Sequence, residues 1–89
     1  MARYEVNATE MAEIGPAGGT PDALFELGLM HSIGRDVEVD LVMAHKWFNL
    51  SALRGNEEAK RYRMEIAQEM SKAEVAEAQR QAREWLSCH

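Results

Sequence analysis

The chain has 89 residues, which is enough for one domain at most and leaves a net stability of only a few kcal/mol. Charged residues make up 28% of the sequence and apolar residues 46%, a balance typical of a folded domain and unlike that of a disordered chain. The net charge is -5, with eight acidic against three basic residues in 1–53 and seven of each in 54–89, which excludes the basic face that nucleic acid requires.

Membrane insertion and disulfide bonding are also excluded by simple counts. The longest uninterrupted apolar run, 41–44, has four residues, and the first residues lack the apolar stretch of a signal peptide. Cys88 is the only cysteine, so no intrachain disulfide can form. We therefore expect a cytoplasmic protein, without membrane insertion.

The first stretch, 1–19, ends in Gly-Pro-Ala-Gly-Gly, which is typical of a flexible break. Before that break, residues 7–10 resemble a helix cap, with Met11 and Ile14 on one side of the short helix that would follow. We expect 1–19 to be a flexible or short-helical segment and 20–87 to be a separate helical domain.

The first main helix begins at Thr20-Pro21-Asp22, which combines an N-cap, a first-turn proline and an acidic residue near the positive end of the helix dipole. Its inner face follows helical spacing and consists of Leu24, Leu27, Gly28 and His31. Gly34 is suited to end this helix in a left-handed conformation.

The second helix has the strongest pattern in the chain. Asp40 is placed to cap it, Arg54 lies in its last turn and Gly55 ends it. Large rings and small residues alternate on its inner stripe, at Ala44, Trp47, Phe48, Ser51 and Ala52. This stripe predicts close packing against a neighbouring helix.

Two further helices follow. Asn56 is placed to cap the third, whose inner face is predicted to contain Ala59, Tyr62, Ile66 and Met70. Ser71 and Glu74 form a capping box that begins the fourth, with an apolar face at Val75, Ala78, Ala82, Trp85 and Leu86. The pattern predicts an all-α fold of four main antiparallel helices.

The spacing of small and aromatic residues resembles the Sel1-like repeat, a tetratricopeptide-related helix–turn–helix unit. The matching residues are Ala23, Leu27, Gly28, Gly34, Val37, Asp40, Ala44, Trp47, Phe48, Ala52, Gly55 and Ala59. Three positions depart from the family pattern: His31 is at a position that is often Tyr, Asp36 is where a glycine is usual, and Ser51 replaces the first Ala of a pair. The tail, with Met70-Ser71 and a final Trp85, is similar to the closing helices of such proteins.

This resemblance implies a fold of the α/α superhelix type, with one helix–turn–helix repeat and a capping helical pair. The residues that it assigns to the structure of the repeat and its cap are Ala23, Gly28, Gly34, Asp40, Ala44, Trp47, Ala52, Gly55, Ala59 and Trp85. Family members act as non-enzymatic adaptors that bind other proteins, often in bacterial signalling or envelope processes. The resemblance identifies no catalytic residue and implies no cofactor.

A single repeat is fewer than the ~3 that usually make a stable solenoid. We expect the lone repeat to leave an apolar face open around Leu24 and Leu27. This face would be covered by residues 1–19, by a partner or by a second copy in a homodimer.

The predicted function is partner binding in an apolar groove between the first two helices. Glu26, Asp36 and Glu38 would form an acidic rim around this groove. The residues assigned to partner binding or self-association are Leu24, Glu26, Leu27, His31, Asp36, Glu38, Phe48 and Tyr62. We place Trp47 in the core, leave Phe48 between core and interface, and expect part of Trp85 to be exposed. The alternatives are a structural homodimer and a bundle that binds a small apolar ligand.

Candidates for catalysis and metal binding are weak. His31, His45, Cys88 and His89 lack the paired spacing of a zinc site, and we expect His31 to be packed and hydrogen-bonded and His45 to lie on the surface. The acidic run from Asp36 has neither the glycine nor the final glutamate of a calcium loop. Nucleophile and phosphate-binding motifs are missing from the sequence, so we expect neither an enzyme nor a bound metal.

Overall fold

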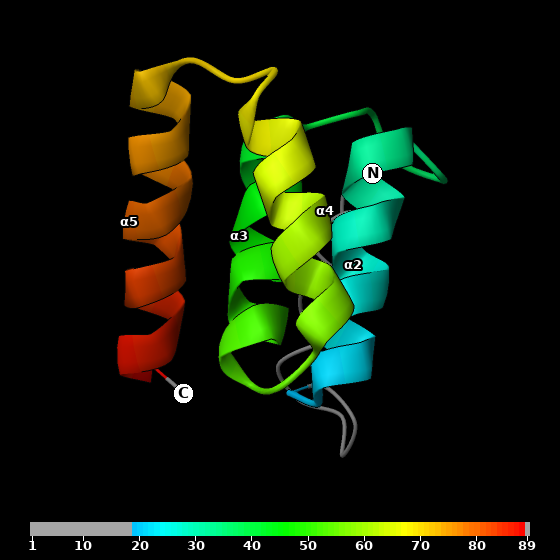
Figure 1. Ribbon diagram of the computed structural model, residues 1–89, viewed down its shortest axis with the longest axis vertical. Coiled ribbons are helices and arrows are strands. Elements are labelled where there is room, and N and C mark those ends of the chain that lie inside the picture. The colour runs from blue at the N-terminus through cyan, green and yellow to red at the C-terminus, as the bar shows by residue number, and fades with distance from the viewer. Residues whose placement is uncertain (1–18, 89) are drawn as a thin grey trace, which may run out of the picture.

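A computed structural model of the protein describes residues 19–88, and these form four α-helices (Figure 1). The helices are α2 (Pro21–Ile33), α3 (Leu41–Leu53), α4 (Glu57–Ala67) and α5 (Lys72–Cys88). Each runs antiparallel to the next, and α3 packs against all three of the others. The predicted all-α fold with four main helices is confirmed over the described residues.

The predicted short helix at Met11 and Ile14 lies outside the described residues, as does His89. The division into 1–19 and 20–87 therefore stays a prediction. Within 19–88, no helix is both long and apolar enough to cross a membrane.

Helix starts follow the local rules that the sequence suggested. The side chains of Thr20, Asp40 and Asn56 each accept a hydrogen bond from the backbone N–H three residues later, at 3.1 Å. The capping box before α5 is complete: Ser71 N–H donates to Glu74 Oε1 at 2.8 Å, and Glu74 N–H donates to Ser71 Oγ at 3.1 Å. Each cap satisfies an otherwise unpaired amide and contributes about 1 kcal/mol.

Left-handed residues follow α2 and α3 and shape the loop between them. Gly34 has φ of 80°, and its N–H donates to the Met30 carbonyl at 2.9 Å. Asp36, which stands where the family pattern has a glycine, has φ of 66°. Aspartate tolerates this region better than most residues, so the loop keeps its shape without the glycine. Arg54 is the C-cap of α3, and Gly55, with φ of 116°, follows Arg54.

The α2–α3 pair is held by one very close approach and one partly buried hydrogen bond. A Cβ atom at Gly28 would overlap the ring of Phe48, so only glycine lets these helices come this close. At one end of the pair, Ser51 Oγ donates to the carbonyl of Pro21 at 2.7 Å. The hydroxyl that departs from the family alanine therefore joins the end of α3 to the start of α2.

Two apolar clusters make up the core, and α2 and α3 contribute to both. The first cluster joins them to α5 through Leu24, Leu27, Trp47, Leu50, Ala82 and Trp85. The second joins them to α4 through Ala44, Phe48 and Ala59, with partly buried Phe25, Leu29, Ala52, Tyr62 and Ile66 around these. The helix α3 is thus buried on more than one face, which is why Leu50 is buried although it lies outside the predicted stripe.

One predicted inward residue points outward. Leu86 is 40% exposed, although we assigned it to the apolar face of α5. The inner face of α5 consists instead of Ala78, Ala82 and Trp85.

Candidate interaction surface

The leucines predicted to line an open groove are buried. Leu24 has no exposed surface and Leu27 is 8% exposed, and both pack in the cluster that contains Trp47 and Trp85. The expectation of an exposed apolar face at these leucines is wrong, and so is the expectation of a partly exposed Trp85. The reason is that α5 returns to α3 and places its indole ring in the same cluster, 6.0 Å from the ring of Trp47 and nearly perpendicular to it.

His31 is packed and hydrogen-bonded, as predicted. It is buried, and Nδ1 lies 3.0 Å from the Leu27 carbonyl oxygen, to which it donates when protonated there. Its backbone carbonyl accepts from Asp40 N–H at 3.0 Å, which ties the end of α2 to the start of α3. His31 therefore stabilises the α2–α3 turn and is not available at the surface.

The predicted acidic rim is exposed. Glu26, Asp36 and Glu38 all lie at the surface, and Glu26 Oε1 is 3.5 Å from Arg35 Nη2. These carboxylates do not surround an open groove at Leu24, because that position is closed.

Aromatic rings join α2, α3 and α4 at a different place. Phe48 of α3 is fully buried, which assigns it to the core. The ring of Phe25 lies 5.6 Å from that of Phe48 and 5.1 Å from that of Tyr62, the latter pair in an edge-to-face arrangement. Edge-to-face pairs place the positive edge of one ring on the negative face of the other and stabilise the contact. Phe25 was not among the predicted site residues, although it lies one residue from the predicted stripe.

Between α2 and α4 lies a surface that we call the α2–α4 face. Its apolar side chains are half-buried Phe25, Leu29, Tyr62 and Ile66, together with exposed Ile33, at 63%. In α2, the residues at 25, 29 and 33 follow helical spacing and share one side of the helix. The two helices stand beside each other at the front of the molecule (Figure 1), and Asn56 Nδ2, just before α4, lies 3.4 Å from Asp22 Oδ1.

Exposed carboxylates line both edges of the α2–α4 face. They are Asp22 and Glu26 on α2, and Glu58 and Glu65 on α4. Helical spacing puts the last two on the side of α4 that carries Tyr62. The arginines near this face are engaged: Arg61 lies 3.8 Å from Glu58 and 3.4 Å from Glu65, and Arg35 pairs with Glu26.

On the other side of α4, His45 is buried, so its predicted surface position is wrong. It lies on α3 one residue beyond the predicted stripe and is 3% exposed, because α3 is covered on several sides. Burial lowers the pKa of His45, and the positive charge of Arg63 lowers it further. Arg63 Nη1 also donates to Asn49 Oδ1 at 2.6 Å, which joins α4 to α3. At neutral pH His45 is therefore an uncharged side chain in the contact between α3 and α4.

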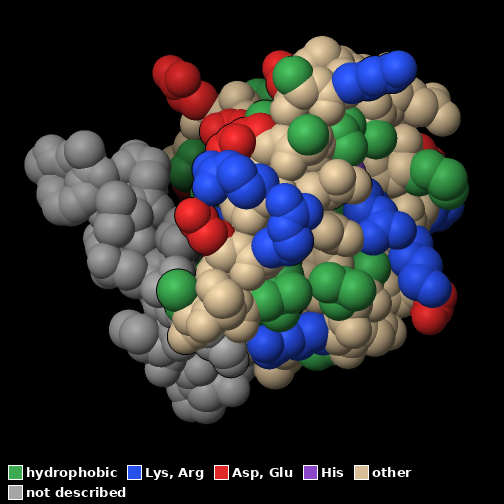
Figure 2. Space-filling view, turned by 90° about the vertical axis from the view of Figure 1, so that its left-hand side faces the viewer, with side chains coloured by type: hydrophobic (Ala, Val, Ile, Leu, Met, Phe, Trp, Pro, Cys, Tyr) green, Lys and Arg blue, Asp and Glu red, His purple; other side chains and the backbone are tan. Residues whose placement is uncertain are grey.

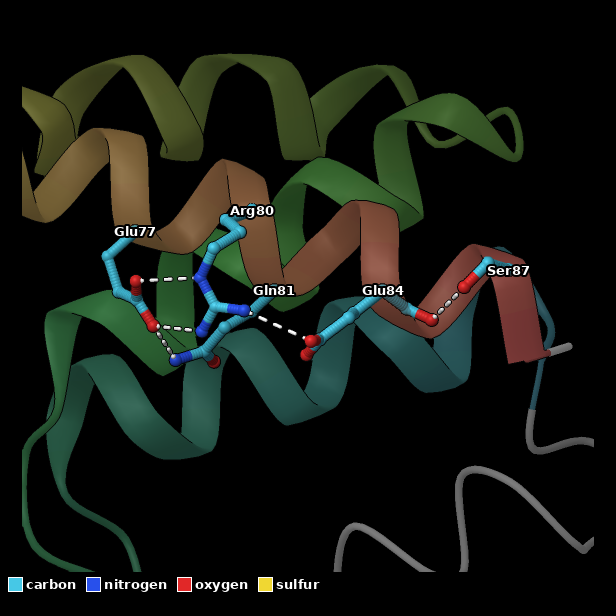
Figure 3. A network of polar contacts seen from close by, with 5 residues as sticks. All are labelled: Glu77, Arg80, Gln81, Glu84 and Ser87. Atoms are coloured by element: carbon cyan, nitrogen blue, oxygen red, sulfur yellow. Dashed lines mark hydrogen bonds and ion pairs between the residues drawn. The ribbon is translucent and has the colours of Figure 1, made fainter.

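The outer face of α5 differs from the α2–α4 face. Figure 2 shows basic and acidic side chains mixed with small, separated areas of hydrophobic side chain. In Figure 3, Arg80 bridges two carboxylates: its Nη2 lies 2.6 Å from Glu77 Oε2, and its Nη1 lies 3.0 Å from Glu84 Oε2. Gln81 Nε2 donates to the same Glu77 oxygen at 2.8 Å. These hydrogen bonds lower the pKa of Glu77 to about 2, and the bond from Arg80 has the largest effect.

Over residues 19–88, no three side chains of the types His, Cys, Asp and Glu lie close enough together to hold a metal ion.

One comparison with known proteins gave a match, and it covers the helical hairpin formed by α2 and α3. Residues 21–56, which contain α2, the loop and α3, match the family model of the Sel1 repeat. Comparisons with curated proteins and with solved structures gave no match. The match ends before α4 and α5, so their likeness to a closing helical pair stays a prediction.

Proposed function

Because the chain is a Sel1-like repeat protein whose repeat occupies residues 21–56, we propose that it is a non-enzymatic module that binds a segment of a partner protein. Sel1 repeats generally mediate protein–protein interaction. The proposal gives the chain no catalytic role and a cytoplasmic location, in keeping with its single cysteine.

We assign the binding surface to the α2–α4 face. The observation that carries this assignment is the combination of a partly exposed apolar stripe with carboxylates along both edges. Interfaces typically place apolar and aromatic side chains at the centre and polar ones around them. The predicted groove at Leu24 lacks this character because its floor is buried, and the outer face of α5 lacks a continuous apolar stripe.

A peptide selection tests the proposal. The full chain is immobilised and used to select binders from a random peptide library, and the selected peptides are synthesised and titrated into isotope-labelled chain. We expect saturable binding, with amide shifts concentrated at Phe25, Leu29, Ile33, Tyr62 and Ile66. Failure to select any saturable peptide, or shifts centred on α5, would contradict it.

The chain offers a matched pair of variants for this experiment. Ile33 and Leu53 are each the last residue of a 13-residue helix and are 63% and 62% exposed, but only Ile33 belongs to the α2–α4 face. Ile33→Ser should weaken binding about tenfold, the cost of losing one buried aliphatic contact, whereas Leu53→Ser should leave it unchanged. Equal effects would mean that the peptides bind exposed apolar side chains in general.

A further inference from the structure

We propose that the segment bound by the α2–α4 face is a positively charged amphipathic helix. This inference rests on the proposed function and adds the chemistry of the partner. Three features support it: the charge along the face, the ring of Tyr62, and the closed hydrogen bonding of the two helices.

The α2–α4 face carries an excess of negative charge at neutral pH. Four carboxylates line it, and the two arginines near it already pair with Glu26, Glu58 and Glu65. The face therefore carries two more negative than positive charges. Lysine and arginine side chains of a partner would meet this field on either side of the apolar stripe, and complementary charge raises both association rate and specificity.

The half-buried ring of Tyr62 favours a cation as well. The guanidinium of Arg61 lies over the Tyr62 ring, with its carbon 4.9 Å from the ring centroid. The ring face thus accepts a positive group, which its quadrupole attracts. A cationic side chain of a partner would take the place of Arg61 at this ring.

Backbone hydrogen bonding favours a helical partner over an extended one. The backbone groups of α2 and α4 pair within each helix, so the face offers no edge to which a strand could add. An extended segment would bury amides without partners, whereas a helix satisfies its own. The helix α2 has 13 residues and is about 20 Å long, which matches about three to four turns of a partner helix.

The same charge disfavours two other occupants. A second copy docking by two-fold symmetry would set carboxylates against carboxylates. The chain's own residues 1–18 contain Glu5, Glu10 and Glu13 against a single Arg3, so they too are acidic.

Three synthetic 18-residue peptides test the inference with the full chain. The first is an amphipathic helix of Leu and Lys, the second has Glu in place of Lys, and the third has the first composition in an order without amphipathic spacing. We expect saturable binding of the first alone, weakened as ionic strength rises from about 0.05 M to about 0.5 M. Equal binding of the Glu peptide would overturn the cationic assignment, and equal binding of the reordered peptide would overturn the helical one.

Glu57 and Glu58 provide a matched control for charge. Both lie in the first turn of α4 and each pairs with a basic residue three positions later, but only Glu58 lies on the side of α2. Glu58→Gln should weaken binding of the Leu/Lys peptide about two- to fivefold, and Glu57→Gln less than twofold. Equal losses would mean that the peptide responds only to net charge, which would overturn the inference.

The outcomes separate this inference from the proposed function. If selected peptides bind the α2–α4 face but are neutral or acidic, the face is a binding site and the partner chemistry is wrong. If the free chain self-associates through this face more strongly as salt rises, the occupant is a second copy and the inference fails.

Discussion

At the scale of single residues, the departures from the family pattern have different explanations. Asp36 adopts the left-handed conformation that glycine usually supplies. The ring of His31 is hydrogen-bonded to the Leu27 carbonyl within α2, and its backbone carbonyl accepts from Asp40 N–H across the α2–α3 turn. Ser51 has the clearest role, because its hydroxyl donates to the Pro21 carbonyl across 30 positions of sequence. Such a bond between the end of one helix and the start of another fixes how the pair closes.

Replacing this serine with the family residue tests that role. Ser51→Ala should lower the free energy of unfolding by about 1 kcal/mol, because a partly buried hydrogen bond is lost while the helix propensity of alanine offsets part of the cost. Chemical denaturation measures the change, with Ser87→Ala on the exposed end of α5 as the control. A stability equal to or above that of the original chain would mean that the hydroxyl adds nothing to the closure of the pair.

At the scale of elements, α5 has two different sides. Its inner side places Ala78, Ala82 and Trp85 in the core, and its outer side carries the bridge from Glu77 through Arg80 to Glu84. Because the positions are three and four apart, the bridge spans two turns and favours the helical conformation. The depressed pKa of Glu77 links the stability of this element to pH.

The sign of that link follows from the direction of the shift. The folded pKa of Glu77 is about 2, below its ordinary 4.5, so its contribution is present above about pH 4.5 and is lost as pH falls toward about 2. Unfolding measured across this range should show a smaller loss of stability in Glu77→Gln than in the original chain. Identical pH profiles for the two proteins would show that the bridge is not populated in solution.

The elements also show which parts of the structure a sequence can predict. The caps at Thr20, Asp40 and Asn56 and the turn at Gly34 depend on residues within a few positions, and these predictions are confirmed. The surface position expected for His45 was wrong because a prediction from one apolar stripe assumes that a helix is buried on one side. The helix α3 is covered on several sides. The open groove was wrong because the distant Trp85 packs with Leu24, and local spacing carries no information about that contact.

At the scale of the whole molecule, charge and packing together bear on self-association. The net charge is -5, the leucines expected to drive dimerisation are buried, and the α2–α4 face is itself acidic. An isologous contact through that face would bring like charges together, at a cost that salt reduces.

We therefore expect a monomer at neutral pH and low ionic strength. Sedimentation equilibrium across a wide range of concentrations should give a mass near 10.1 kDa, the mass of one chain. A stable dimer under these conditions would favour the structural homodimer, and Ile33→Ser would then show whether the α2–α4 face forms its interface.

The two core clusters have a consequence for how the chain can change over time. Both contain residues of α2 and α3, but α4 contributes only to one and α5 only to the other. Substitutions in α4 and α5 that face separate clusters should then combine additively, since they share no partners. Evolution can therefore vary α4, which carries half of the proposed binding face, without having to rebuild the contacts of α5.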